Sequence, residues 1–202
     1  MRYAQVMRQP PDREFAQVSS LNEALTQRLQ HFNTLQGTIR ATASGWLLAT
    51  FAGVGFALTE QLATGDGLLM AAAVALFGSV GTLLLWNLDL LVYHPLLDAV
   101  FHEVIALEKD HDWLPQVAHN MKAVATNGGI RDQLLWFYKG TFGATVLLGL
   151  GCTLSWAMDG PRWTVAAVVP WVVYAGGVLV AMNRRTGNTD ETFKKLRTDG
   201  AA

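Results

Sequence analysis

Charged side chains are missing from four long stretches of this 202-residue chain, although Asp, Glu, Lys and Arg make up 15% of it. The stretches are residues 41–59, 67–88, 140–158 and 163–183. At about 1.5 Å per residue, each is roughly 30 Å long as a helix, which matches the hydrocarbon thickness of a bilayer. Helices buried inside water-soluble domains rarely reach this length without a charge. The pattern therefore predicts four transmembrane helices rather than short, alternating barrel strands.

Motifs that mark common catalytic or cofactor sites are also missing. The chain has neither a Walker-type glycine loop nor a GxSxG elbow. A single cysteine, Cys152, cannot form an intrachain disulfide, and we expect it to be a small packing residue in the third apolar stretch. None of the five histidines lies in a charge-free stretch, which argues against a membrane haem. We expect no enzyme, no catalytic residue and no cofactor.

A metal site has a weak signal in the middle of the chain. Glu108 and His111 have the i, i+3 spacing used by carboxylate sites in helix bundles, but such sites need two copies of that motif and one is present. The histidines and acids nearby are better explained as a solvated helix face, so we expect no metal. These residues are His102, His111, His119, Glu103, Asp110 and Asp112. Basic residues are spread over several segments and mixed with acids, which argues against nucleic-acid binding.

The distribution of Lys and Arg predicts how the chain crosses the bilayer. All 15 fall in residues 1–40, 89–139 and 184–202, except Arg162 in a short turn. The positive-inside rule then places both termini and the middle segment in the cytoplasm, with the protein in the cell (inner) membrane. The predicted parts are a cytoplasmic amphipathic helix within 1–40, transmembrane hairpin 1 over 41–93, a cytoplasmic helical segment over 94–137, transmembrane hairpin 2 over 138–184 and a cytoplasmic tail over 185–202. The fold class is an all-α integral membrane protein.

The N-terminal segment shows a helix signature. Pro10-Pro11 predicts irregular structure over 1–18, and Ser20 to Glu23 matches a capping box that would start a helix. An apolar stripe follows at helical spacing: Leu21, Leu25, Leu29, Phe32, Leu35 and Ile39. Two interpretations stay open, namely a helix packed on the bilayer or on the chain's own cytoplasmic segment, and an oligomerisation helix. No proline separates it from the first span, so the two can be continuous.

Small residues recur at every fourth position in the first two spans. They form one ridge in each span, which predicts close helix contact within the hairpin or between copies of the chain: Gly45, Ala49 and Gly53 in the first, and Ala71, Ala75 and Ser79 in the second. In the fourth span Pro170 predicts a kink.

Polar residues at the end of the second span are the candidate functional positions. Asn87 and Asp89 interrupt an apolar stretch, where polar groups cost free energy, so they are candidates for a pore or a partner site. Residues two apart on a helix point about 200° from each other, so one pore wall would hold only one of them. His94 flanks them, and His94-Pro95 predicts a helix boundary. The alternative is that these groups lie at headgroup level on a helix that projects into the cytoplasm.

In layout the chain resembles the small multipass effectors of bacterial anti-phage defence systems. That resemblance covers the arrangement of spans and brings no functional residue with it. It implies a homo-oligomeric, channel-like membrane effector. The first alternative is a non-conducting anchor or sensor subunit that recruits a cytosolic protein through residues 20–40 and 95–127. The second is a transporter or intramembrane enzyme, which the scarcity of polar residues at mid-span disfavours.

Overall fold

The computed structural model describes residues 12–60, 67–124, 130–158 and 164–199, and in these ranges it contains helices and no strand. The all-α prediction is therefore confirmed. In chain order the elements are α1 (Asp12–Glu60), α2 (Gly67–Trp86), the π-helix η1 (Asn87–Tyr93), α3 (His94–Asp110), α4 (Val117–Val124), α5 (Ile130–Met158) and α6 (Thr164–Asp199).

Helix α1 is continuous from Asp12 to Glu60, so the N-terminal amphipathic helix and the first apolar stretch are one element. The predicted helix start at Ser20 is wrong, because its hydroxyl donates to the carbonyl of Gln17 2.8 Å away inside the helix. The expectation of irregular structure is likewise wrong from Asp12 onwards, and residues 1–11 lie outside the described part. The reason is that the prolines precede Asp12 in the sequence, and a proline before a helix does not interrupt it.

Helices α2, η1 and α3 form one rod from Gly67 to Asp110. The boundary predicted at His94-Pro95 is the point where the π-helix gives way to α3. Pro95 has no N–H for the carbonyl of Leu91, and its ring would clash with that carbonyl in a regular α-helix. A wider turn just before the proline avoids this clash: the N–H of His94 bonds to the carbonyl of Asp89, five residues back.

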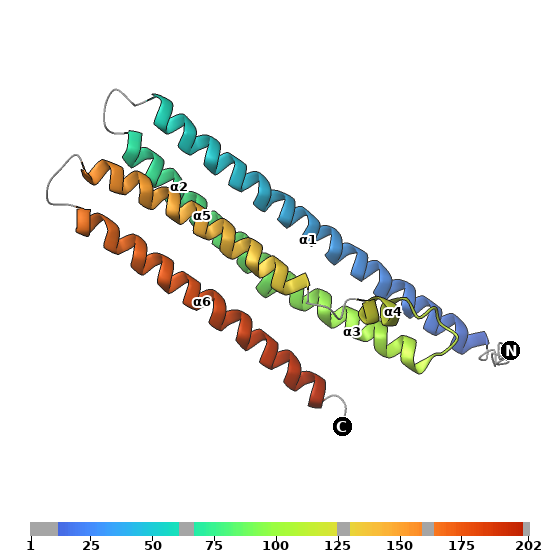
Figure 1. Cartoon of the computed structure of the whole chain (residues 1–202). Coiled ribbons are helices and arrows are strands. Elements are labelled where there is room, and N and C mark those ends of the chain that lie inside the picture. Colours follow the sequence, from blue (N-terminus) through green and yellow to red (C-terminus); the bar gives the residue numbers. More distant parts are fainter. Residues whose placement is uncertain (1–11, 61–66, 125–129, 159–163, 200–202) are drawn as a thin grey trace.

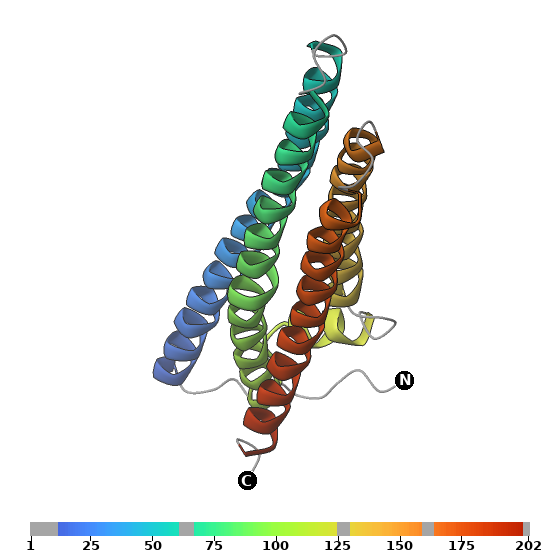
Figure 2. The same cartoon turned by 90° about the vertical axis from the view of Figure 1, so that its left-hand side faces the viewer.

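The long helices run side by side in alternating directions (Figure 1). Helix α2 packs against both α1 and α5, α5 also packs against α6, and α3 continues beyond α2 to pack on the first half of α1. Figure 2 shows that the first residue of α1 and the last residue of α6 lie at the same end of the bundle. Part of the apolar stripe of the N-terminal helix packs inside the chain, because half-buried Leu25, Leu29 and Phe32 belong to the part of α1 beside α3, whereas Leu21 is 49% exposed.

The rod ends at Asp110, just before the residues from Asp112 to Pro115. The backbone turns back through residues 111–116, where the N–H of Leu114 donates to the carbonyl of His111 over 2.9 Å. The short helix α4 then packs back on α3. Residues 125–129 lie outside the described part.

Three of the helices in the described part are long and apolar enough to cross a membrane: Arg13–Thr59, Gly67–Asp110 and Arg131–Met158. Large apolar side chains cover their outer surfaces, among them Leu48 at 70% exposed and Phe77 at 72%. Such an exposed apolar surface is compatible with lipid contact. Helix α6 continues through Pro170, which lies exposed inside it.

Candidate functional site

The side chain of Asp89 is completely buried, at 0% exposed, and it binds two other helices. From α1, Arg40 Nε donates to Asp89 Oδ2 over 3.1 Å and Nη2 donates to Oδ1 over 3.4 Å. From α5, the hydroxyl of Tyr138 donates to Asp89 Oδ2 over 3.1 Å. A buried carboxylate requires such partners, since its solvation by water has been lost. One side chain of η1 therefore joins three helices.

A chain of polar contacts continues from Arg40 towards α3. Arg40 Nη2 also donates to Gln36 Oε1 over 3.0 Å, and Gln36 Nε2 lies 3.5 Å from His94 Nδ1. The other ring nitrogen of His94 lies 3.8 Å from Asp98 Oδ2. We call Gln36, Arg40, Asp89, His94 and Tyr138 the inner network. It connects the apolar part of the bundle to the part that carries the charged residues.

The inner network lies where the charge-free stretches end. Arg40 directly precedes the first stretch, Asp89 directly follows the second, and Tyr138 lies just before the third. At the same level Lys139 Nζ donates to Asn183 Oδ1 over 2.6 Å, at the end of the fourth. Ionised groups cost several kcal/mol in a low-dielectric interior unless they are paired, and pairing Arg40 with Asp89 offsets that cost.

Burial lowers the pKa of His94, which lies beyond the apolar stretch that ends at Leu88. The negative charges of Asp98 and Asp89 raise the pKa of His94, whereas the positive charges of Arg131 and Arg40 lower it further. The imidazole is therefore held in its neutral form, which can accept a hydrogen bond from the Gln36 amide.

The three predicted polar positions have different environments. Asp89 is the centre of the inner network, His94 is at its edge, and Asn87 is half-buried with no hydrogen bond from its side chain to another described residue. The partners Arg40, Tyr138 and Gln36 were missed. Arg40 was counted only for its charge. A signal was available, because a lone acid beside an apolar stretch needs a partner and Arg40 flanks the neighbouring stretch in the same way.

The small-residue ridges face in different directions. Ala71, Ala75 and Ser79 are fully buried in α2, and the hydroxyl of Ser79 lies 3.0 Å from that of Tyr174 in α6. Gly45 and Ala49 are exposed in α1, and a side chain at Gly45 would meet no atom. Contact within the hairpin is therefore not made by these two residues, and contact between copies stays a prediction.

The close approach of α1 and α2 depends on other glycines. A Cβ atom at Gly81 would overlap the ring of Trp46, and one at Gly78 would overlap Thr50. Trp46 Nε1 donates to the carbonyl of Gly78 over 3.0 Å. From the predicted ridge in α1, Gly53 takes part, because its Cβ would lie 3.1 Å from Val74. The contact of Trp46 with Gly78 and Gly81 of α2 thus takes the place of the expected contact between the two small-residue ridges.

Glu108, considered above as a metal ligand, stabilises the start of α4. Its two carboxylate oxygens accept the backbone N–H groups of Ala118 and His119, each over 2.8 Å. These groups have no partner within a helix, and a negative charge is favoured there. In the described residues no group of three or more His, Cys, Asp or Glu side chains could hold a metal ion.

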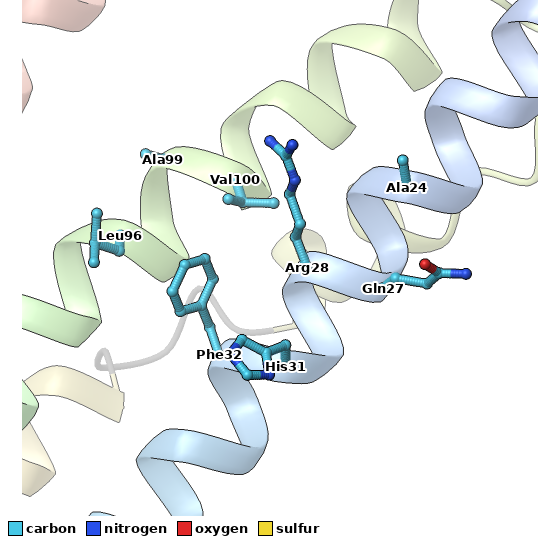
Figure 3. Close-up of a pocket in the computed structure, with 8 residues that line it drawn as sticks. All are labelled: Ala24, Gln27, Arg28, His31, Phe32, Leu96, Ala99 and Val100. Carbon is cyan, nitrogen blue, oxygen red and sulfur yellow. The ribbon is translucent and has the colours of Figure 1, made fainter.

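A surface groove lies between α1 and α3, and its volume is about 560 Å³. Figure 3 shows side chains from both helices around it. Arg28, His31 and Phe32 come from α1, and Leu96, Ala99 and Val100 come from α3. The lining is apolar except for the cationic and amide side chains supplied by α1.

Comparisons with protein-family models, curated proteins and solved structures find no match to this chain. The class defined by the fold and the site is a bundle of long, largely apolar helices, in which a buried Asp pairs with a partly exposed Arg.

Proposed function

We propose that the chain is a four-span protein of the cell (inner) membrane, with both termini cytoplasmic, that assembles from several copies as a channel-like effector. In this proposal the inner network holds the cytoplasmic helices and the spans together, and we call this contact the latch. The observation that carries it is the fully buried carboxylate of Asp89, bound by Arg40 of α1 and Tyr138 of α5.

The physical support for a latch is the high cost of separating these groups. Moving α1 or α5 away from η1 would leave a charge in a low-dielectric environment without its partner, which costs about 3–5 kcal/mol for a buried pair. Such a contact is either made or broken, with little in between. π-helical segments often occur at functional sites, and Asp89 lies inside one.

The support for four spans is the common level of the charged residues. Residues 163–183 form a fourth charge-free stretch, and its end is bonded to Lys139 beside the inner network. With both hairpins ending at this level, the bilayer boundary would lie there, and the cationic residues beyond it would face the cytoplasm.

An ion-flux assay with purified protein in liposomes tests the proposal. Asp89→Asn keeps the size of the side chain but removes the charge that holds Arg40, so we expect a larger flux than in the unmodified protein. Asp98→Asn is the matched control, because the side chain of Asp98 is 44% exposed and lies outside the four charge-free stretches. Liposomes that stay sealed with the unmodified protein and with Asp89→Asn alike would contradict conduction.

A non-conducting anchor is the second candidate, and the groove between α1 and α3 favours it. An anchor needs an uncovered cytoplasmic surface and no pore. Under this alternative, substitutions in the groove abolish recruitment of the partner while Asp89→Asn liposomes remain sealed. Deleting residues 1–40 would be a poor test, because it removes Arg40 and half of the continuous helix α1.

A further inference from the structure

The groove between α1 and α3 is apolar at its base and cationic at its edge. Phe32, Leu96 and Val100 supply apolar surface, and Leu96 remains 46% exposed. The α3 side includes Ala99, whose short side chain leaves room for a neighbouring element. An exposed leucine beside two half-buried apolar side chains, between two antiparallel helices, is typical of a site for a third helix.

The charge of the groove is one-sided. Arg28 and His31 line it, and no Asp or Glu does. In the described part of the chain, no ion pair or hydrogen bond joins the Arg28 side chain to another residue. Of the nearby acids, Glu23 accepts from Gln27 over 3.4 Å and Asp98 lies beside His94. Glu103, one turn beyond Ala99 on α3, is exposed and does not line the groove. An incoming carboxylate would therefore meet an available guanidinium.

Two other occupants fit the groove less well. Arg28 is three turns before Arg40 on the same helix, so it lies roughly 18 Å beyond the level of the inner network, whereas the headgroup layer is only about 5–8 Å deep on each side. A bilayer lipid would not reach it. Residues 1–11 of the chain carry Arg2 and Arg8 and no acid, so their charge is unfavourable beside Arg28.

We propose that this groove binds an acidic amphipathic helix of a cytosolic partner protein, with apolar side chains against Phe32, Leu96 and Val100 and a carboxylate on Arg28. The proposal rests on the proposed function in two respects, namely that the bilayer boundary lies at the inner network and that this end of the bundle faces the cytoplasm. It supplies the input that either an effector or an anchor would need.

The test uses the full chain in nanodiscs of neutral lipid and two fluorescent helical peptides of about 18 residues, the length at which such helices begin to be stable in water. Both carry leucines at i, i+3, i+4 and i+7 spacing. One has Glu at the flanking positions and the other has Lys. Fluorescence anisotropy measures each Kd, and empty nanodiscs correct for binding to lipid.

We expect the Glu peptide to bind at least about tenfold more tightly than the Lys peptide, a difference of 1.4 kcal/mol. Arg28→Glu should reverse that preference, and Ala99→Trp, which fills the groove, should weaken both peptides. Arg13→Glu is the control, because Arg13 is exposed on α1 away from the groove lining, and it should leave the preference unchanged. Thermal unfolding and gel filtration establish that each variant is folded.

Equal binding of the two peptides, or binding that survives Ala99→Trp, would overturn the groove as an acidic-helix site. The outcome is separate from that of the flux assay. Peptide binding with sealed Asp89→Asn liposomes retains the groove and rejects the channel, whereas flux without peptide preference does the reverse.

Discussion

Arg40 Nε lies 3.1 Å from Asp89 Oδ2, and this contact joins helix α1 to the π-helix η1 across 49 residues of sequence. The two side chains are not equally protected, since that of Asp89 is 0% exposed and that of Arg40 is 31% exposed. Arg40 can therefore replace part of the interaction with water, and Asp89 cannot.

Removing the cation should therefore cost more stability than removing the anion. We expect Arg40→Gln to lower the free energy of unfolding by about 3 kcal/mol, because it leaves a buried carboxylate with Tyr138 as its one remaining side-chain partner. Asp89→Asn should cost less, and the double variant less than the sum of the two. Denaturant unfolding in detergent micelles measures all three. Additive effects, or a larger loss for Asp89→Asn, would contradict this account of the pair.

Tyr138→Phe removes one hydrogen bond to a charged group and leaves the ring in place. We expect a loss of about 1.5–2 kcal/mol in the same unfolding experiment, because hydrogen bonds to ionised partners are the stronger kind. Tyr174→Phe is the matched control, since the hydroxyl of Tyr174 contacts only the neutral hydroxyl of Ser79. A Tyr138→Phe variant as stable as the control would show that Asp89 does not need this donor.

Gly81→Ala and Gly45→Ala should have opposite effects on stability. A methyl group at Gly81 overlaps the indole of Trp46, so we expect a loss of about 1–3 kcal/mol. A methyl group at Gly45 meets open space, and alanine in a helix is favoured over glycine by about 0.5–1 kcal/mol. Thermal unfolding compares the two variants. A stable Gly81→Ala variant would rule out this close approach of α1 and α2.

Contact between copies at the exposed ridge is tested with a larger side chain. Gly45→Leu has space in the single chain, so the fold should be unchanged while any oligomer that uses this face dissociates. Light scattering in detergent gives the molar mass before and after the change. Unchanged mass would remove Gly45 and Ala49 from the interface.

Glu108→Gln should loosen α4 without affecting the spans. The amide can accept one of the two N–H groups of Ala118 and His119, and its NH₂ group faces the other. We expect about 1–2 kcal/mol less protection of the α4 amides in hydrogen exchange. Glu103→Gln, at an exposed position on α3, is the control and should change nothing.

His94 makes stability depend on pH in a defined direction. Its pKa is lowered in the folded chain by burial, so its contribution is present above the ordinary value of 6.5 and is lost as the pH falls below it. The groups that act on it are Asp98, Arg131, Asp89 and Arg40. We expect the melting temperature to fall more between pH 7.5 and 5.5 in the unmodified protein than in His94→Asn.

His102 provides the comparison, because it is exposed on the same helix. His102→Asn should keep the full pH dependence of the unmodified protein. An equal fall in all three proteins would mean that His94 does not carry the effect.

The helical class, the long apolar elements and the choice of Asp89 as a candidate position follow from the sequence alone. They depend on properties that are local to the chain, namely helical spacing, the length of charge-free stretches and the cost of an acid beside them. Which residues meet across helices is a different matter. The rotation of α1 about its axis is not visible in the sequence, and it turns Trp46 and Thr50 towards Gly81 and Gly78 of α2 while Gly45 meets open space.

Tertiary structure alone brought Arg40, Asp89 and Tyr138 together, since each is 49 residues from the next in the sequence. The sequence could indicate that the three residues lie at the same position along the bundle axis, because each is next to the end of a charge-free stretch. Their mutual direction depends on the π-helical turn before Pro95, because that turn changes the rotation of every residue within it relative to a regular α-helix. A periodicity argument assumes a constant rotation per residue, so it could identify Asp89 as costly but not name the partners that stabilise it.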